Sequence, residues 1–117
     1  MAAVVLVVDD EQPVAEVIRL LVEDLGHRAV TAPNGLEALK LVEREKPRLV
    51  ISDIMMPHMP GDELCRWLKN EPEHRGVKVI LMSAADARRA EETGADAFVR
   101  KPFDLDAMER LVERFIP

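Results

Sequence analysis

The chain has 117 residues, which fits one domain over residues 1–117 and not two. Its net charge of -6, without a block of Lys or Arg, makes it by itself a poor binder of nucleic acid or anionic membranes, and no apolar run approaches the roughly 20 residues that span a bilayer. The single cysteine, Cys65, excludes an internal disulfide, and the start of the chain lacks the basic segment of a signal peptide, so we expect a cytoplasmic protein.

The first quarter of the chain alternates strand and helix patterns. Val4 to Val8 is a continuous apolar, β-branched run, typical of a strand that is buried on both faces of a parallel sheet. A helix follows, with Pro13 in its first turn and Gly26 at its end, and Arg28 to Ala32 is a short strand. The apolar residues of this helix recur at helical spacing: Val14, Val17, Ile18, Leu21 and Leu25.

The alternation continues to the end of the chain. Asn34 suits an N-cap, with Glu37 three residues later as in a capping box; Pro47 stops that helix, and a strand over Leu49 to Ile51 ends at Ser52-Asp53. The remaining elements are, in order, a turn region over 55–61, a helix around Leu64, Trp67 and Leu68, a strand over Val77 to Met82, a short helix over Asp86 to Thr93, a strand over Ala97 to Val99, and a last helix capped by Asp104. This pattern predicts a single α/β domain with a parallel sheet and right-handed crossovers.

Polar side chains follow the predicted strands where each strand ends. Asp9 and Asp10 follow the first strand, Asp53 the third, Ser83 the fourth and Lys101 the fifth. Because parallel strands end at the same edge of a sheet, and ligands bind outside those ends, these residues should meet in one acidic pocket. Each of them alone has a plainer interpretation, as a capping, turn or surface residue, and only their convergence favours a site.

The chemistry of such a pocket favours phosphoryl transfer to a carboxylate. Three carboxylates packed together repel one another, and a divalent cation removes that penalty. Carboxylate and carbonyl oxygens are ligands that Mg²⁺ accepts. A lysine and a serine hydroxyl beside the metal supply a further charge and a hydrogen-bond donor, as transfer of a phosphoryl group to Asp requires.

Four short stretches resemble those of response-regulator receiver domains in two-component systems, and the resemblance extends over essentially the whole chain. They are Val7-Val8-Asp9-Asp10-Glu11, Ser52-Asp53-Ile54-Met55-Met56-Pro57 with Gly61, Met82-Ser83-Ala84, and Lys101-Pro102-Phe103. The resemblance implies a flavodoxin-like fold, in which a five-stranded parallel sheet of order 2-1-3-4-5 carries helices on both faces. The segment from Ser83 to Lys101 is about one helical turn shorter than is typical, so its helix, the fourth, should be shortened.

The same resemblance assigns a role to each site residue. Asp53 becomes the aspartyl phosphate. Asp10 binds Mg²⁺ directly, Asp9 assists through water, and the backbone carbonyl of Met55 is a further ligand.

The remaining assignments concern the response to phosphate. Lys101, with a cis bond to Pro102, pairs with a phosphoryl oxygen. Ser83 donates to the phosphoryl group, and Phe98 is the aromatic switch residue.

The implied function is that of a regulatory phosphoacceptor and not of an enzyme with a separate substrate, although the domain assists its own Mg²⁺-dependent phosphorylation and dephosphorylation. A histidine kinase or His phosphotransfer protein would supply the phosphoryl group. The surface formed by the fourth helix, the fifth strand and the fifth helix would then change shape for a downstream output domain or protein, or for a homodimer. Met55 and Ala85 carry no polar group to orient water, which predicts slow self-dephosphorylation.

Three alternatives remain to be weighed. A flavodoxin-like electron carrier would need a Ser/Thr/Gly-rich loop after the first strand, where Asp9-Asp10-Glu11-Gln12 stands. An aspartate-nucleophile phosphatase would need a second acid at the position of Met55. A receiver-like interaction module that never sees phosphate should have lost an acidic residue or the lysine, and none is missing. Outside the pocket we expect His27 and His74 at the surface, Trp67 partly buried and Cys65 inert.

Overall fold

The computed structural model describes residues 3–84 and 92–117 as a five-stranded parallel sheet of order β2-β1-β3-β4-β5. The strands are β1 (Val4–Val8), β2 (Arg28–Ala32), β3 (Leu49–Asp53), β4 (Lys78–Ser83) and β5 (Ala97–Arg100). The helices are α1 (Gln12–Asp24), α2 (Gly35–Glu45), α3 (Gly61–Asn70) and α5 (Leu105–Phe115). The predicted helix over Asp86 to Thr93 falls almost wholly in residues 85–91, outside the described part of the chain, and so does Ala85.

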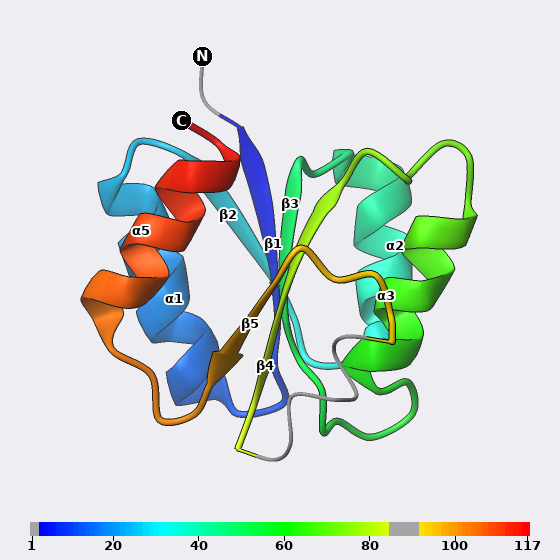
Figure 1. Cartoon of the computed structure of the whole chain (residues 1–117), viewed down its shortest axis with the longest axis horizontal. Helices are drawn as coiled ribbons and strands as arrows, with labels where there is room; N and C mark the ends of the chain where they lie inside the picture. The colour runs from blue at the N-terminus through cyan, green and yellow to red at the C-terminus, as the bar shows by residue number, and fades with distance from the viewer. Residues whose placement is uncertain (1–2, 85–91) are drawn as a thin grey trace.

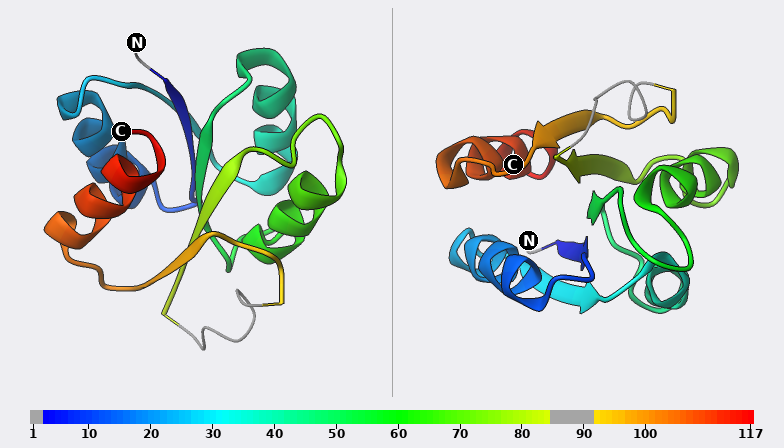
Figure 2. Two further views of the ribbon diagram at one scale, coloured as in Figure 1. Left: turned by 45° about the horizontal axis from the view of Figure 1, so that its top comes forward. Right: turned by 90° about the horizontal axis from the view of Figure 1, so that it is seen from below.

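Helices cover both faces of the sheet, as Figures 1 and 2 show. One apolar core lies between the sheet and α1 with α5, and the other lies between the sheet and α2 with α3. In β1, Leu6 and Val8 point into the second core, while Val5 and Val7 point into the first. All four side chains are fully buried, which explains why β1 is apolar without alternation.

Local signals in the sequence set most element boundaries. The Asn34 side chain accepts a hydrogen bond from the Glu37 backbone N–H at 2.9 Å, and the Asp104 carboxylate accepts one from Asp106 N–H at 2.9 Å. Gly26, at φ 89°, takes the left-handed conformation that ends α1. The fourth strand begins at Lys78, one residue later than predicted, because Val77 N–H closes a turn onto the carbonyl oxygen of His74 at 3.0 Å.

His74 is not a surface residue, so this expectation was wrong. The residue is 4% exposed, and its ring stacks on that of Trp67 with centroids 5.5 Å apart. His27 is also half-buried, and its Nδ1 accepts a hydrogen bond from Ala3 N–H at 3.1 Å. Trp67 is partly buried, as predicted, and Cys65 is fully buried with its thiol pKa raised by burial, which agrees with an inert residue.

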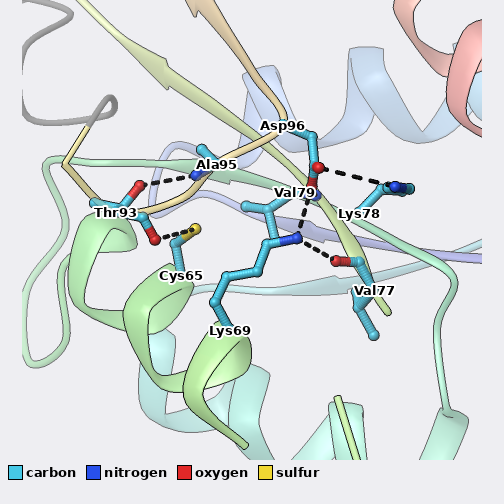
Figure 3. Close-up of polar contacts among 8 residues, drawn as sticks. All are labelled: Cys65, Lys69, Val77, Lys78, Val79, Thr93, Ala95 and Asp96. Atoms are coloured by element: carbon cyan, nitrogen blue, oxygen red, sulfur yellow. Dashed lines mark hydrogen bonds and ion pairs between the residues drawn. The ribbon is translucent and has the colours of Figure 1, made fainter. Parts of the chain in front are cut away.

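A polar network anchors the chain as it enters β5, at the end of the sheet away from the predicted pocket (Figure 3). The Lys69 ammonium donates to Asp96 Oδ2 at 2.8 Å and to the carbonyl oxygen of Val77 at 2.9 Å. Asp96 Oδ2 also accepts from Val79 N–H at 2.8 Å. One lysine therefore ties α3 both to the start of β4 and to the segment before β5.

Removing this lysine should cost more stability than removing a surface lysine. Lys69→Met should lower the free energy of unfolding by about 2 kcal/mol, because it removes the ammonium donor from the Val77 carbonyl oxygen and from Oδ2 of Asp96, whose side chain is only 21% exposed. Lys40→Met is the matched control, since the Lys40 side chain is 73% exposed and its ion pair with Glu37 should contribute little. Urea unfolding measures both, and equal effects would contradict the anchoring role.

Candidate phosphoacceptor site

The residues predicted from the strand ends do converge. The Lys101 ammonium lies 3.0 Å from Asp9 Oδ2 and 3.3 Å from Asp53 Oδ2. Asp9 and Asp53 are only 2% and 5% exposed, whereas Asp10 is exposed. Ser83, 2% exposed, lines the same hollow.

The backbone holds these side chains at one edge of the sheet. Asp9 N–H donates to the carbonyl oxygen of Ala32 at 3.1 Å, which extends the pairing of β1 with β2. Ile54 N–H continues β3 by donating to the carbonyl oxygen of Met82 at 2.9 Å. Lys101 N–H donates to the carbonyl oxygen of Ser83 at 3.0 Å, and the bond between Lys101 and Pro102 is cis, as predicted.

A close backbone approach fixes the turn after Asp53. Gly61 N–H donates to the carbonyl oxygen of Ile54 at 2.9 Å and brings the start of α3 against β3. A Cβ at Gly61 would lie 2.1 Å from the carbonyl oxygen of Asp53 and 2.8 Å from Ser52 Oγ. Only glycine fits there without moving the chain that carries Asp53.

The acidic group fits a hard divalent cation. Asp9, Asp10 and Asp53 each offer one carboxylate oxygen, and these three atoms lie within 4.8 Å of one another. The donors are all oxygens, as Mg²⁺ prefers, and the exposure of Asp10 leaves room for water ligands. A hollow of about 290 Å³ opens above them, and its walls comprise Asp10, Glu11, Asp53, Met55, Ser83, Ala84 and Lys101.

Comparison with known proteins shows to which family this fold belongs. The response regulator receiver domain family matches residues 5–113. The chain belongs to this family.

Individual relatives support the same family assignment. The polar-differentiation response regulator DivK of Brucella anthropi is 30% identical over 116 residues, covering 96% of this chain and 94% of its own. The signal receiver domain of a histidine kinase from Syntrophus aciditrophicus superposes with a TM-score of 0.92 at 37% identity, covering 98% of this chain and 90% of that one. The receiver domain of a sensor histidine kinase from Pseudomonas aeruginosa, crystallised with magnesium in its active site cleft, shares the fold at a TM-score of 0.87, with 23% identity and 99% and 98% coverage.

The protein is thus a receiver domain of two-component signalling, in the fold that its sequence predicted. The family binds Mg²⁺ at its acidic site and interacts with histidine kinases and downstream partners. Neither the comparisons nor the geometry favours a phosphorylation-independent module. No helix in residues 3–84 and 92–117 has both the length and the apolar character to cross a bilayer.

Burial and charge shape the titration of the receiver pocket. Burial raises the pKa of the Asp53 carboxyl above its ordinary value; Lys101 opposes this shift, while the charges of Asp9 and Asp10 add to it. Burial alone would lower the pKa of the Lys101 ammonium, but its hydrogen bond to Asp9 and the negative charges of Asp9 and Asp53 outweigh that effect and raise it. The lysine is therefore held as a cation between carboxylates.

Glu11 is the pocket residue to which the sequence assigned no role. Its carboxylate lies 3.4 Å from the Lys101 ammonium, and its side chain is 63% exposed at the mouth of the hollow. Its backbone N–H also donates to Asp9 Oδ1 at 2.9 Å. Its place directly after Asp9 and Asp10 was the available signal, because a residue at the start of that loop lies at the same sheet edge.

Phe98, the predicted switch residue, lies on β5 away from the carboxylates. It is partly buried, packs against the core under α2 and α3, and lines a hollow on the β5–α5 side of the molecule. The neighbouring residue 97 pairs with Ile80, and Phe98 itself pairs with Leu81 in β4. Its partner Leu81 lies two residues before Ser83, the last residue of β4.

An apolar hollow of about 550 Å³ borders the acidic pocket and shares Ala84 and Lys101 with it. The start of α1 and the turn before α5 form its walls, which also include Pro13, Val14, Val17, Pro102, Phe103 and Leu105. Val17 and Leu105 are 42% and 49% exposed. Apolar side chains of this size on the surface beside a reactive pocket are typical of a contact area for another protein.

Proposed function

We propose that Asp53 accepts the phosphoryl group, from a phosphohistidine of a sensor histidine kinase or of a His phosphotransfer protein. The observation that carries the proposal is the Asp53 carboxylate, buried 3.3 Å from the Lys101 ammonium and clustered with the carboxylates of Asp9 and Asp10. One oxygen of Asp53 attacks phosphorus as the bond between phosphorus and the histidine nitrogen breaks. The leaving imidazole takes up one proton from solvent, so the products are an aspartyl phosphate and a neutral imidazole.

Three residues of the pocket would bind Mg²⁺ directly, and a fourth would bind it through water. Asp10, Asp53 and the Met55 carbonyl would hold Mg²⁺ directly, with Asp9 acting through water. Bound Mg²⁺ supplies positive charge that offsets the charge of the phosphoryl oxygens.

Two further side chains would meet the phosphoryl group itself. Lys101 would pair with one phosphoryl oxygen, and the Ser83 hydroxyl would donate to another. The domain in this scheme is a regulatory phosphoacceptor that assists its own phosphorylation and dephosphorylation.

Phosphorylation would change the conformation of the domain through Ser83 and then Phe98. Donation by the Ser83 hydroxyl would draw the end of β4 toward Asp53, and Phe98 would turn into the space that this movement leaves. The surface of β5 and α5 would then change shape for a downstream protein, an output domain or a second copy. Residues 1–117 would act as one domain in this switch.

The apolar hollow beside the pocket is the surface we assign to the phosphoryl donor. A donor must place its phosphohistidine over Asp53, so part of its surface must cover the neighbouring wall formed by Val14, Val17 and Leu105. Burying such side chains stabilises a complex without requiring charge complementarity. Histidine kinases make phosphohistidine from cytoplasmic ATP, so the domain would work in the cytoplasm.

The direct test is to locate the phosphate. The protein should take up one phosphoryl group from acetyl phosphate in the presence of Mg²⁺, and none after the metal is removed with EDTA. Mass spectrometry of peptides should place the modification on Asp53. Uptake that survives EDTA, or that maps to another residue, would rule the assignment out.

Loss of the lysine should slow the reaction without removing the acceptor. Lys101→Met should lower the rate of phosphoryl uptake from acetyl phosphate by about 10²–10³-fold, the usual effect of deleting one group that stabilises transition-state charge. Lys78→Met is the control, because Lys78 lies at the far end of β4 and is exposed. A rate within a factor of two of the wild type would contradict the role of Lys101.

A further inference from the structure

A second group of metal-binding side chains lies at the opposite end of the sheet from Asp53. Glu43 comes from the last turns of α2, and Glu73 and His74 come from the loop between α3 and β4. Figure 1 shows this loop beside the end of α2, at the edge where the strands begin. One imidazole nitrogen and one oxygen from each glutamate lie within 4.8 Å of one another.

The histidine of this group is held in place before any ion binds. Its side chain is 5% exposed, and its ring stacks on Trp67. Its backbone is fixed on both sides, since His74 N–H donates to the Glu71 carbonyl oxygen and its own carbonyl accepts from Val77 N–H. The Nε2 atom lies 3.0 Å from Oε1 of Glu43, whose side chain is 55% exposed.

The two carboxylates are free to adjust around that fixed nitrogen. The Glu43 side chain is 55% exposed and Glu73 is exposed, so small rotations of either cost little. Ligands of a tetrahedral ion with bonds of about 2.1 Å are about 3.4 Å apart, close to the 3.0 Å separation of the His74 and Glu43 atoms. The Lys46 ammonium lies 3.8 Å from Glu43 Oε2, and this exposed ion pair contributes little.

We propose that Glu43, Glu73 and His74 form a second cation site, selective for a zinc-class transition metal. Neutral imidazole is a ligand for Zn²⁺, Co²⁺, Ni²⁺ and Cu²⁺, whereas Mg²⁺ prefers a set of oxygens such as the Asp9, Asp10 and Asp53 cluster. A water would complete the tetrahedron on the exposed side. The ion would join α2 to the α3–β4 loop and stabilise the folded domain by mass action.

The fluorescence of Trp67 can report metal binding at this site. It is the one tryptophan in the sequence, and its ring is 5.5 Å from that of His74, so Co²⁺ bound to His74 should quench its fluorescence. Co²⁺ is titrated into the full chain in excess Mg²⁺, and the apparent Kd is read from the quenching. Zn²⁺ should then reverse the quenching by competition and raise Tm.

Two substitutions and a control make the test decisive. His74→Gln keeps an N–H donor for Glu43, and Glu73→Gln changes an exposed side chain. Each should weaken the apparent Kd at least about tenfold. His27→Gln alters a half-buried histidine outside this group, and the variant should bind as the wild type does. The site does not exist if the wild type shows no quenching, or if either Glu73→Gln or a folded His74→Gln leaves the Kd unchanged.

Discussion

Replacing Asp53 with asparagine should abolish phosphoryl uptake from acetyl phosphate and, at the same time, stabilise the metal-free domain. The amide has the shape of the carboxylate but cannot form an acyl phosphate, so no modification should appear by mass spectrometry. Asp24→Asn, at the exposed end of α1, should take up phosphate as the wild type does. Uptake by Asp53→Asn or Asp53→Ala at the wild-type level would overturn the assignment of the acceptor.

The gain in stability follows from the direction of the pKa shift. Burial raises the folded-state pKa of Asp53, so the folded protein binds its proton more tightly than the unfolded chain does. The wild type therefore loses stability as pH rises from the ordinary value of 3.8 through the raised pKa. Asp53→Asn avoids this loss, and Lys101 keeps Asp9 and Glu11 as partners.

Urea unfolding at several pH values checks this second effect. At neutral pH without metal, Asp53→Asn should be more stable on the order of 1 kcal/mol, a common size for one substitution. The difference should shrink as pH falls and vanish below the ordinary carboxyl pKa. Excess Mg²⁺ should also reduce this difference in stability, because the wild type binds the cation more tightly than Asp53→Asn does. A difference that does not depend on pH would show that charge at Asp53 is not its cause.

Gly61→Ala should lower the stability of the domain more than most substitutions of one small residue by another. The added Cβ would lie 2.1 Å from the Asp53 carbonyl oxygen, and this neighbour is backbone that cannot rotate away. We expect a loss of about 3 kcal/mol in the free energy of unfolding, the upper range for overpacking. Phosphoryl uptake by the folded fraction should also slow, because the turn must move the chain that holds Asp53.

Gly76→Ala is the matched control for this experiment. Among residues 3–84 and 92–117, apart from Gly76 and its two chain neighbours, no heavy atom would lie within 4 Å of a Cβ at Gly76, which is in the loop before β4. Its effect on stability should be small or favourable, because alanine lowers the entropy of the unfolded chain. Thermal or urea unfolding compares the two variants, and equal destabilisation would show that the close approach to Asp53 is not the reason glycine is required.

Most of the fold could be predicted from local sequence, because its signals act over a few residues. The bounds of β1 and β2 are those expected, and Asn34 and Asp104 cap α2 and α5 as predicted. The error at the start of β4 was one residue, since the turn from His74 to Val77 is set by the path of the α3–β4 loop. The strand order itself came from resemblance, because the periodicity of an element does not say which strand is its neighbour.

Some features of the site could likewise be predicted from the sequence, and others only from the tertiary structure. The sequence by itself determined that Asp9, Asp53 and Lys101 belong together, because every parallel strand ends at the same edge of its sheet. Only the tertiary structure decided that Glu11 also touches Lys101, and that Gly61 leaves no room for a Cβ beside Asp53.

Contacts at the other end of the sheet could not be predicted from the sequence either. The sequence placed His74 at the surface, and packing buried it between Trp67 and Glu43, a residue 31 positions away. Burial and contact depend on the side chains that arrive from distant segments. The spacing of residues along one helix or strand does not carry that information.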